Sequence, residues 1–366
     1  MKTVVLGGYG NFGARICRAL AHWPGIELVV AGRNKAKAAA MAAECGATSA
    51  VIDIHDPQLT QVLSGMGAGL VIHTAGPFQE QGYAVAQASA RAGAHYIDLA
   101  DGRRFVCDFH AALHSDFRRN GKLGITGAST VPALSSAVIN ALTAGWDTVA
   151  DIDICIAPAQ TAPRGVATMA AVLGYCGAPI QVWDGGRWNT RHGWEAPATV
   201  SFKRLQPRLG ALCDIPDLEL FPANYPGSQS VMFRAALEVG ISQRGLALLG
   251  ALHRRGIVKH PQRFAAFLNR AAGWLDPFGS ALGGMVVRLE GSRDGQRVQA
   301  EWHIAADDDH GPEIPCMAAV LLARKIAAGD VGDMGGSGAI TSMNLLTLAE
   351  FEPEFAKWKM VTDHGA

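Results

Sequence analysis

The feature that most constrains the fold is a glycine motif close to the N-terminus. It reads Gly8-Tyr9-Gly10-Asn11-Phe12-Gly13, follows a short apolar run at residues 3–6, and opens a helical pattern over residues 11–21. Glycines at this spacing allow a tight turn, a close approach of backbone to a pyrophosphate, and close packing of helix on strand. The motif therefore predicts dinucleotide binding at a helix N-terminus, and a purely structural turn is the alternative.

The first 130 residues give this motif its context. Short β-branched runs alternate there with alanine-rich helical segments. The predicted strands cover residues 3–6, 27–31, 50–53, 70–73, 95–98 and 123–126. Strands that alternate with helices in this way predict an α/β fold, a Rossmann doubly wound parallel sheet.

The pattern changes after residue 130. Alternation over residues 151–157, and hairpin signals at Asp184-Gly185 and Asp294-Gly295, predict a second α+β domain with a mixed or antiparallel sheet. A helical pattern at residues 317–328 follows two prolines. We therefore expect residues 1–130 to form the nucleotide-binding domain, with 313–366 packed back on it. Residues 131–312 would form a domain for substrate and dimerisation.

The end of the second predicted strand indicates which dinucleotide is bound. In NAD-binding domains a carboxylate about 20 residues after the glycines holds the ribose 2′-hydroxyl. Here the sequence is Ala31-Gly32-Arg33-Asn34-Lys35-Ala36-Lys37, with no carboxylate. Arg33 can pair with a 2′-phosphate, and Asn34 and Lys37 are further donors. NADP(H) is therefore favoured over NAD, and a solvated arginine is the alternative.

Further cofactor contacts are expected at the ends of the third and fourth strands. Asp53 is placed to accept from the adenine amino group, or simply ends its strand. The run Thr74-Ala75-Gly76-Pro77-Phe78 should line the nicotinamide end, although Gly76 and Pro77 are also explained as turn residues. The predicted cofactor-binding residues are Gly8, Tyr9, Gly10, Asn11, Phe12, Gly13, Arg33, Asn34, Lys37, Asp53, Thr74, Ala75, Gly76, Pro77 and Phe78.

The fifth strand carries the candidates for chemistry. Tyr96, Asp98 and Asp101 are the predicted proton relays, and Arg103 is predicted to hold a substrate anion. The alternative is that Asp98 or Asp101 caps the helix that begins near Arg103. In the second domain, Arg164 is a second predicted anion clamp.

Aromatic side chains of the second domain are a further candidate group. Trp183, Trp188 and Trp194 could close over the nicotinamide, with core or interface packing as the alternative, and His192 is a weaker acid candidate.

Composition excludes several classes of protein. The chain has 366 residues with 32 Lys plus Arg and 32 Asp plus Glu, and this balance does not favour nucleic-acid binding. Its seven scattered cysteines favour reduced thiols and no metal site. No apolar run is long enough for a membrane span. We expect a cytoplasmic protein.

Four segments together resemble the saccharopine dehydrogenase family. They are Gly7-Gly8-Tyr9-Gly10-Asn11-Phe12-Gly13, Ala31-Gly32-Arg33, Ala75-Gly76-Pro77-Phe78 and His95-Tyr96-Ile97-Asp98-Leu99-Ala100-Asp101-Gly102-Arg103. The resemblance is specific over residues 1–135 and looser beyond. It implies a Rossmann domain, an inserted domain that binds substrate and often forms a dimer, and NAD(P)-linked hydride transfer. In the family this chemistry acts on a C–N bond that joins two amino-acid-like pieces.

The sequence therefore favours an NADP(H)-dependent oxidoreductase that acts on the imine or carbonyl carbon of a small, amino-acid-derived molecule. We expect it to form a homodimer. Two alternatives stay open. One is an enoyl (C=C) reductase, as in other relatives of the family, and the other is a non-catalytic NADP-binding regulatory protein.

Overall fold

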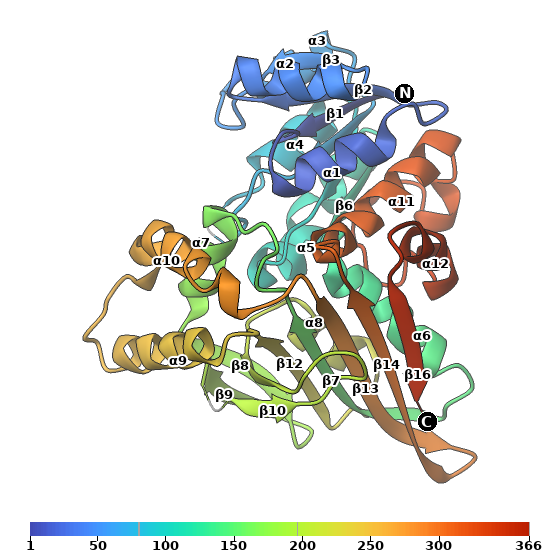
Figure 1. Ribbon diagram of the computed structural model, residues 1–366. Helices are drawn as coiled ribbons and strands as arrows, with labels where there is room; N and C mark the ends of the chain where they lie inside the picture. Colours follow the sequence, from blue (N-terminus) through green and yellow to red (C-terminus); the bar gives the residue numbers. More distant parts are fainter. Residues whose placement is uncertain (80, 196, 366) are drawn as a thin grey trace. The chain divides into compact units, whose positions relative to one another are not determined.

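The computed structural model describes residues 1–79, 81–195 and 197–365. The chain divides into two compact units (Figure 1). Unit 1 contains Met1–Leu134 and Glu313–Leu346, and unit 2 contains Ser135–Pro312 and the residues from Thr347 onward. No helix in the described ranges combines the length and the apolar character needed to cross a membrane.

Unit 1 is built on a seven-stranded sheet with the order β15-β6-β5-β4-β1-β2-β3, in which all neighbouring strands are parallel. The strands are β1 (Lys2–Leu6), β2 (Glu27–Gly32), β3 (Thr48–Val51), β4 (Leu70–His73), β5 (His95–Asp98), β6 (Leu123–Thr126) and β15 (Gly338–Thr341). Strands β3 to β6 follow the order of a doubly wound nucleotide-binding sheet. This confirms the predicted fold class.

Helices connect these strands because each carries an apolar face that the sheet buries. They are α1 (Asn11–Leu20), α2 (Lys35–Glu44), α3 (Leu59–Gly65), α4 (Ala84–Arg91), α5 (Arg103–Arg119) and α11 (Ile314–Ala328). In α1 the buried residues Ile16, Cys17 and Leu20 recur at helical spacing and face a β1 whose Val4 and Val5 are fully buried. The parallel sheet thus places the carboxyl ends of its strands, and the loops that follow them, at one edge.

Unit 2 is built on a mixed sheet with the order β10-β11-β12-β7-β13-β14-β16, and β8 and β9 extend from β12. Its strands are β7 (Thr148–Ala157), β8 (Pro179–Asp184), β9 (Trp188–His192), β10 (Ala198–Val200), β11 (Arg208–Leu212), β12 (Ser230–Ala236), β13 (Gly283–Arg293), β14 (Gln296–Ala306) and β16 (Val361–Gly365). Its helices are α6 (Ser135–Leu142), α7 (Val166–Tyr175), α8 (Asp217–Asn224), α9 (Gly240–Arg254), α10 (Ala265–Gly273) and α12 (Leu348–Lys357). The β12–β7 pair is parallel and its neighbours are antiparallel, so the sheet is mixed as predicted.

Both predicted hairpins are present. Asp294 and Gly295 have φ values of 53° and 72° between β13 and β14. Gly185 and Gly186, with φ values of 64° and 68°, join β8 to β9. Positive φ at two successive residues is the geometry of a tight turn that matches strand twist, and glycine or aspartate tolerates it best.

The C-terminal segment corrects one expectation. Residues 313–346, with α11 and β15, belong to unit 1, but the chain from Thr347 onward belongs to unit 2. There β16 pairs antiparallel with β14, and α12 contacts α6. Residues 347–365 therefore belong to unit 2 and not to the nucleotide-binding unit, because β16 completes the sheet of unit 2.

Candidate functional site

The glycine loop of unit 1 is folded tightly against the first two strands. Gly7 has a φ of +79°, and its N–H and that of Gly8 donate to the Ala31 carbonyl at 2.9 and 3.1 Å. A Cβ at Gly13 would lie 2.2 Å from the Gly7 carbonyl oxygen and 2.7 Å from the Thr74 hydroxyl oxygen. Only glycine fits there, so the third motif glycine allows α1 to pack on the turn, as predicted.

The second motif glycine has a different environment. A Cβ at Gly10 would meet only the Gly7 carbonyl oxygen, at 3.1 Å, whereas one at Gly8 would lie 2.9 Å from both Val30 and the Val5 carbonyl oxygen. Gly10 also precedes α1 as its N-cap and supplies no side-chain cap. The first turn of α1 therefore offers N–H groups and the positive end of the helix dipole beside an uncovered backbone. This cradle fits a pyrophosphate.

Asn11 and Phe12 begin α1, and the structure gives the Asn11 side chain a partner within the helix. Its Oδ1 accepts from Arg15 Nη1 at 2.8 Å, and Arg15 Nε lies 2.9 Å from Glu313 Oε1 at the start of α11. Arg15 thus orients Asn11 and ties α1 to α11. This role of Arg15 could not be predicted from the sequence, because its partner Glu313 comes some 300 residues later.

The end of β2 presents an exposed cationic segment. Arg33, Lys35 and Lys37 are all exposed, and residues 31–37 include no acid. Asn34 is the N-cap of α2, since its Oδ1 accepts from the Lys37 N–H at 3.0 Å. The Asn34 side-chain oxygen is therefore used in the helix cap, whereas the Arg33 and Lys37 side chains extend into solvent.

Tyr9 links the glycine loop to this cationic segment. Its ring covers Gly32, where a Cβ would lie 2.4 Å from the ring edge, and its hydroxyl accepts from the Asn34 N–H at 2.9 Å. Tyr9 is one of the predicted cofactor residues, but its hydrogen bond to Asn34 could not be predicted from the sequence. Asp53 is exposed, with its Oδ1 accepting from the His55 N–H at 3.1 Å. Its adenine contact stays a prediction.

The loop after β4 is held in place by side chains from its own neighbourhood. The Thr74 hydroxyl donates to the Leu6 carbonyl at 2.9 Å, and Gln81 Nε2 donates to the Ala75 and Pro77 carbonyls at 2.8 Å each. Phe78 is buried, with its ring 5.0 Å from that of His73. Its side chain therefore belongs to the core, so any cofactor contact would come from the backbone of residues 74–77.

Two of the predicted proton relays are buried in unit 1. Tyr96 and Asp98 are both 0% exposed. The Tyr96 hydroxyl lies 3.1 Å from His73 Nδ1, and its ring stacks on Phe109. Tyr96 thus lies inside the protein core, and its role as a proton relay stays a prediction.

Asp98 joins two strands. Its Oδ1 accepts from the Ala100 N–H at 2.9 Å, the Thr126 hydroxyl at 2.9 Å and the Gly127 N–H at 2.8 Å. These bonds connect the end of β5 to the end of β6. Burial raises the pKa of Asp98 to about 6 despite these donors. The carboxyl therefore has a structural role as an acceptor, and its role as a relay stays a prediction.

Asp101 and Arg103 differ in exposure. Asp101 is exposed, and its Oδ1 accepts from Gln79 Nε2 at 3.0 Å. Arg103 is only 8% exposed and has partners within the structure. Neither predicted aspartate caps α5, whose N-cap is Gly102 with no side-chain bond. Among the relay candidates, Asp101 is therefore the one that reaches the surface of unit 1.

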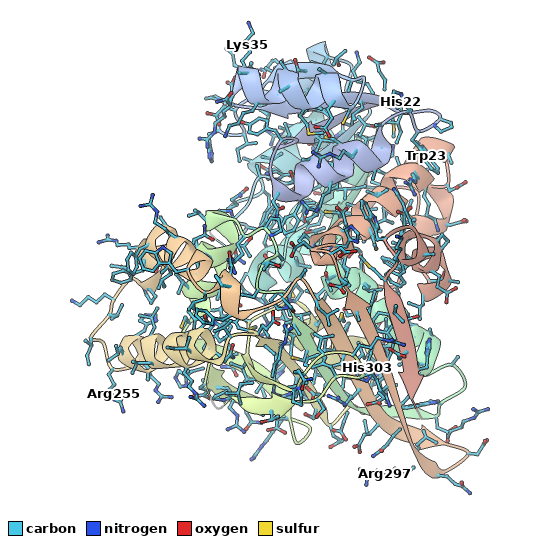
Figure 2. The ribbon with its side chains drawn as sticks, viewed as in Figure 1. His22, Trp23, Lys35, Arg255, Arg297 and His303 are labelled. Atoms are coloured by element: carbon cyan, nitrogen blue, oxygen red, sulfur yellow. The ribbon has the colours of Figure 1, made fainter. Side chains whose placement is uncertain are left out.

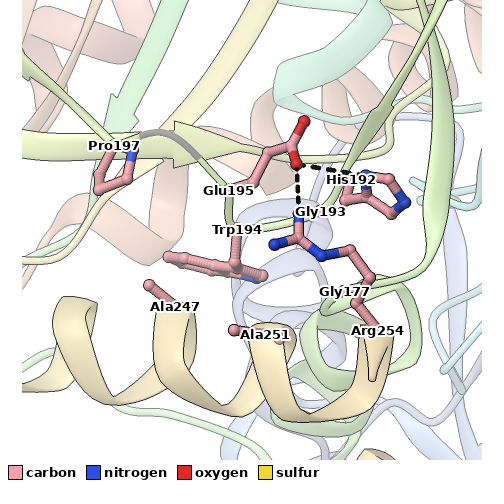
Figure 3. A pocket seen from close by; sticks show the side chains of 10 residues that line it. Gly177, His192, Gly193, Trp194, Glu195, Pro197, Ala247, Ala251 and Arg254 are labelled. Atoms are coloured by element: carbon pink, nitrogen blue, oxygen red, sulfur yellow. Dashed lines mark hydrogen bonds and ion pairs between the residues drawn. The ribbon is translucent and has the colours of Figure 1, made fainter. Parts of the chain in front are cut away.

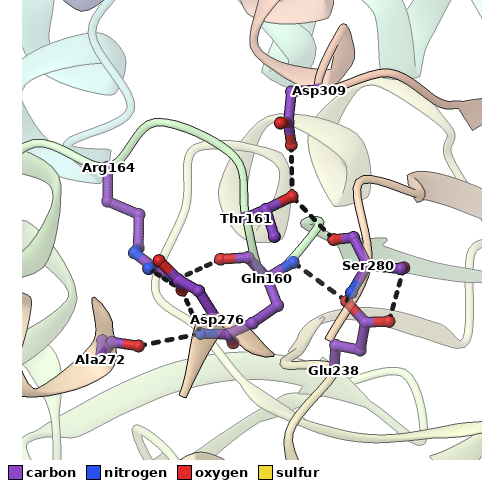
Figure 4. Close-up of polar contacts among 8 residues, drawn as sticks. All are labelled: Gln160, Thr161, Arg164, Glu238, Ala272, Asp276, Ser280 and Asp309. Carbon is purple, nitrogen blue, oxygen red and sulfur yellow. Dashed lines mark hydrogen bonds and ion pairs between the residues drawn. The ribbon is translucent and has the colours of Figure 1, made fainter. Parts of the chain in front are cut away.

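In unit 2, Arg164 lies in a polar network (Figure 4). Its guanidinium contacts the Asp276 carboxylate and the Gln160 carbonyl. Gln160 in turn donates from Nε2 to Asp276 at 3.0 Å and from its N–H to Glu238 at 3.0 Å. The loop after β7 is thereby fixed to the loops next to β12 and β13. Arg164 as a substrate clamp stays a prediction, and it would have to exchange Asp276 for the substrate.

The three tryptophans predicted to close over the nicotinamide do not form one lid. Trp183 and Trp188 face each other across the β8–β9 hairpin with ring centroids 5.1 Å apart, while Trp194 is only 1% exposed. Trp194 lines a pocket of about 180 Å³ between the end of β9 and α9 (Figure 3). In this pocket, Glu195 contacts both His192, at 3.2 Å, and Arg254, at 3.0 Å. The Glu195 carboxylate is therefore already paired within the protein.

Comparison with known proteins agrees with this geometry. Residues 3–125 match the family model described as the saccharopine dehydrogenase NADP binding domain. The predicted resemblance is thus confirmed for this part of the chain, which carries a nicotinamide dinucleotide-binding domain. No curated protein sequence matches the chain.

Solved structures show the same fold at low identity. Apo saccharopine dehydrogenase (L-Glu forming) from Saccharomyces cerevisiae is 12% identical with a TM-score of 0.68, and each chain is covered to 100%. Homospermidine synthase from Legionella pneumophila, in complex with NAD, is 11% identical with a TM-score of 0.59, covering 100% of this chain and 91% of that one. An engineered D-amino acid dehydrogenase bound to NADP+ is 13% identical with a TM-score of 0.50, covering 96% and 98%. At these identities the likeness shows the fold alone.

Proposed function

We propose that this protein is an NADP(H)-dependent oxidoreductase that transfers hydride between nicotinamide and the imine or carbonyl carbon of an amino-acid-derived substrate. One observation carries the proposal. The glycine loop, in which only glycine fits at position 13, is followed by an exposed cationic segment, residues 31–37, that contains no carboxylate. The matched NADP-binding domain family supports it.

The choice of NADP(H) rests on charge at the end of β2. A carboxylate there would hold a ribose diol and repel a 2′-phosphate. Arg33 instead offers a planar guanidinium that can pair with phosphate oxygens through two N–H groups, and Lys37 adds a second cation. Tyr9 supports this segment through its bond to Asn34. The arrangement favours the phosphorylated cofactor.

For the reaction, the bound cofactor would supply or accept the hydride, and the chain would orient it. The α1 N-terminus would hold the pyrophosphate, and the backbone of residues 74–77 would lie at the nicotinamide end of the sheet edge. We assign proton transfer to Asp101 Oδ2, because Oδ1 is occupied by Gln79. The protein atoms around Asp101 raise its pKa although the side chain reaches solvent, which favours a proton-carrying carboxyl.

The substrate class rests on the family resemblance. Saccharopine dehydrogenase is named for a substrate in which a C–N bond joins two amino-acid pieces, and it shares this fold over the whole chain. Arg103 and Arg164 are the proposed anchors for substrate carboxylates. The enoyl reductase and the NADP-binding regulator remain alternative outcomes of the experiments below.

The cofactor assignment is tested by titrating NADPH and NADH into wild type and Arg33→Ala. We expect wild type to prefer NADPH, and the variant to lose about 10- to 100-fold in NADPH affinity because a charged hydrogen-bond pair is removed. NADH affinity should stay unchanged. Arg187→Ala, which removes an exposed arginine from the β8–β9 turn, is the control. A wild type that prefers NADH would refute the assignment.

The reaction is tested by NADPH oxidation on panels of α-keto acids with amines, and on enoyl esters. Turnover on the first panel is expected, and Asp101→Asn should lower kcat by about 100-fold or more while NADPH still binds. Turnover on enoyl esters alone would establish the C=C reductase. Tight NADPH binding with no turnover on either panel would establish the regulatory protein.

Two expectations remain as proposals beside this one, a homodimeric assembly and a cytoplasmic location. Sedimentation of the full chain at several concentrations tests the first, and fractionation of cells tests the second.

A further inference from the structure

The outer side of α10 is unusual for a surface helix. It carries Phe267, 62% exposed, and is followed by Trp274 and Phe278, 69% and 76% exposed. Its inner side holds a small residue, Ala265, which is 4% exposed. A surface helix of a globular protein normally turns its large apolar residues inward and its polar residues outward. Here Phe267, Trp274 and Phe278 instead keep most of their ring surface exposed in the described part of the chain.

Arginines share this side of the helix. Phe267 and Arg270, three residues apart, share one face of α10, while Arg263 lies in the 3-10 helix Pro261–Phe264 before it and Trp274 directly follows it. Both arginines are exposed. We call the exposed side chains Arg263, Phe264, Phe267, Arg270, Trp274 and Phe278 the aromatic-cationic face. It combines four aromatic rings with two cations.

The charge around this face departs from that of the chain. The whole protein is balanced at 32 basic and 32 acidic residues, whereas residues 239–278 contain six basic residues and one acid, Asp276, whose carboxylate contacts Arg164. The six basic residues are Arg244, Arg254, Arg255, Lys259, Arg263 and Arg270. Within the described chain, Arg254 is paired with Glu195 and no ion pair is found for the other five. Figure 1 shows the connection between α9 and α10 projecting from unit 2, and Figure 2 shows Arg255 on it, pointing outward.

We propose that this face docks on the surface of an anionic lipid bilayer. Exposed Phe and Trp side chains on a helix insert at the boundary between headgroups and acyl chains, and neighbouring Arg and Lys pair with lipid phosphates. The contact is peripheral, because α10 spans only Ala265–Gly273. The face belongs to unit 2, whereas the glycine cradle belongs to unit 1.

Charge complementarity decides between occupants. A symmetric contact with a second copy would place the arginines of one aromatic-cationic face against those of the other, because each subunit presents the same face. A soluble polyanion would satisfy the arginines but leave the aromatic rings exposed. An anionic bilayer satisfies both, since it offers phosphates beside an apolar layer.

The test is co-sedimentation of the full-length protein with phosphatidylcholine vesicles, with and without phosphatidylglycerol. Binding is expected only with phosphatidylglycerol and should weaken as salt is raised. Phe267→Ala with Trp274→Ala should weaken it by about tenfold or more, because buried aromatic area is lost. Arg263→Gln with Arg270→Gln should weaken it by a similar factor. Trp188→Ala, which removes an exposed tryptophan elsewhere, should leave it unchanged.

Unchanged circular dichroism and NADPH affinity in each variant would show that the fold is kept. Equal binding to both vesicle types, or binding that survives both double variants, would overturn the proposal. So would a failure to bind vesicles, together with a dimer that the Phe267→Glu variant dissociates. That result would identify the face as an interface between two copies of the chain.

Discussion

Two parts of the same sheet edge in unit 1 are built in opposite ways. After β1 and β2 the chain presents bare backbone, a helix N-terminus and exposed cations. Within β5 the side chains of Tyr96 and Asp98 instead turn inward and are fully buried. The first region can bind a charged ligand, whereas in the second the Asp98 carboxylate joins the end of β5 to the end of β6. An acid at the end of a strand is therefore a ligand-binding candidate only if the next strand does not use it.

The sharpest way to break this comparison is to fill the cradle. In Gly13→Ala the new Cβ would fall 2.2 Å from the Gly7 carbonyl oxygen, a backbone atom that cannot move without opening the turn. We expect NADPH affinity to fall by about 100-fold or more, and unfolding to become easier by about 1–3 kcal/mol through overpacking. Calorimetric titration and urea denaturation measure the two effects.

Gly65→Ala is the matched control, because a Cβ at that helical position meets nothing within 4 Å. It should keep NADPH affinity and raise stability slightly. If Gly13→Ala bound NADPH like wild type, α1 and the turn would not form the pyrophosphate site.

The buried region predicts the opposite outcome for Asp98→Ala. Three donors, from Ala100, Thr126 and Gly127, would lose their acceptor inside the protein. We expect the free energy of unfolding to fall by about 3–5 kcal/mol, with NADPH affinity of the folded protein unchanged within about twofold. Asp101→Ala, at an exposed site, should cost less than about 0.5 kcal/mol. A stable Asp98→Ala variant that had lost only turnover would support the relay assignment.

How far the sequence could anticipate this edge depends on where each partner lies in the chain. The glycine loop, the strands of the parallel sheet and both hairpins follow from patterns that span a few residues, and all were predicted. The bonds that join Asp98 to a second strand could not be predicted, because its partners Thr126 and Gly127 come 28 and 29 residues later in the chain. The contact between Tyr9 and Asn34 spans 25 residues and was missed for the same reason. Nothing in a local pattern states which buried acceptor meets which distant donor.

The dependence of stability on acid pH tests the two buried titratable residues His73 and Asp98. Burial lowers the pKa of His73 to about 4, so the unfolded chain binds the extra proton below about pH 6.5 and stability falls on acidification. Burial raises the pKa of Asp98 to about 6, so the folded chain binds the extra proton and stability rises between about pH 6 and about pH 4. The two contributions oppose each other in wild type.

Asp98→Asn should therefore lose more stability than wild type between about pH 7 and about pH 4.5, by about 2 kcal/mol. Urea denaturation at the two pH values measures the difference. Asp56→Asn, which changes an exposed carboxyl, should follow wild type. An Asp98→Asn variant that also followed wild type would mean that this carboxyl stays ionised in the folded protein.

The smallest expected effect concerns the contact between the two exposed segments. Tyr9→Phe keeps the ring over Gly32 but removes the hydroxyl that accepts from the Asn34 N–H. One lost hydrogen bond corresponds to about 1 kcal/mol, so NADPH affinity should fall by about fivefold. NADH affinity should fall less, because it does not use the segment that carries Arg33. Tyr83→Phe removes a hydroxyl bonded to the Phe105 carbonyl at 3.0 Å and should leave both affinities unchanged. Equal losses for both cofactors in Tyr9→Phe would mean that the hydroxyl supports the glycine loop alone, and that Arg33 is positioned without it.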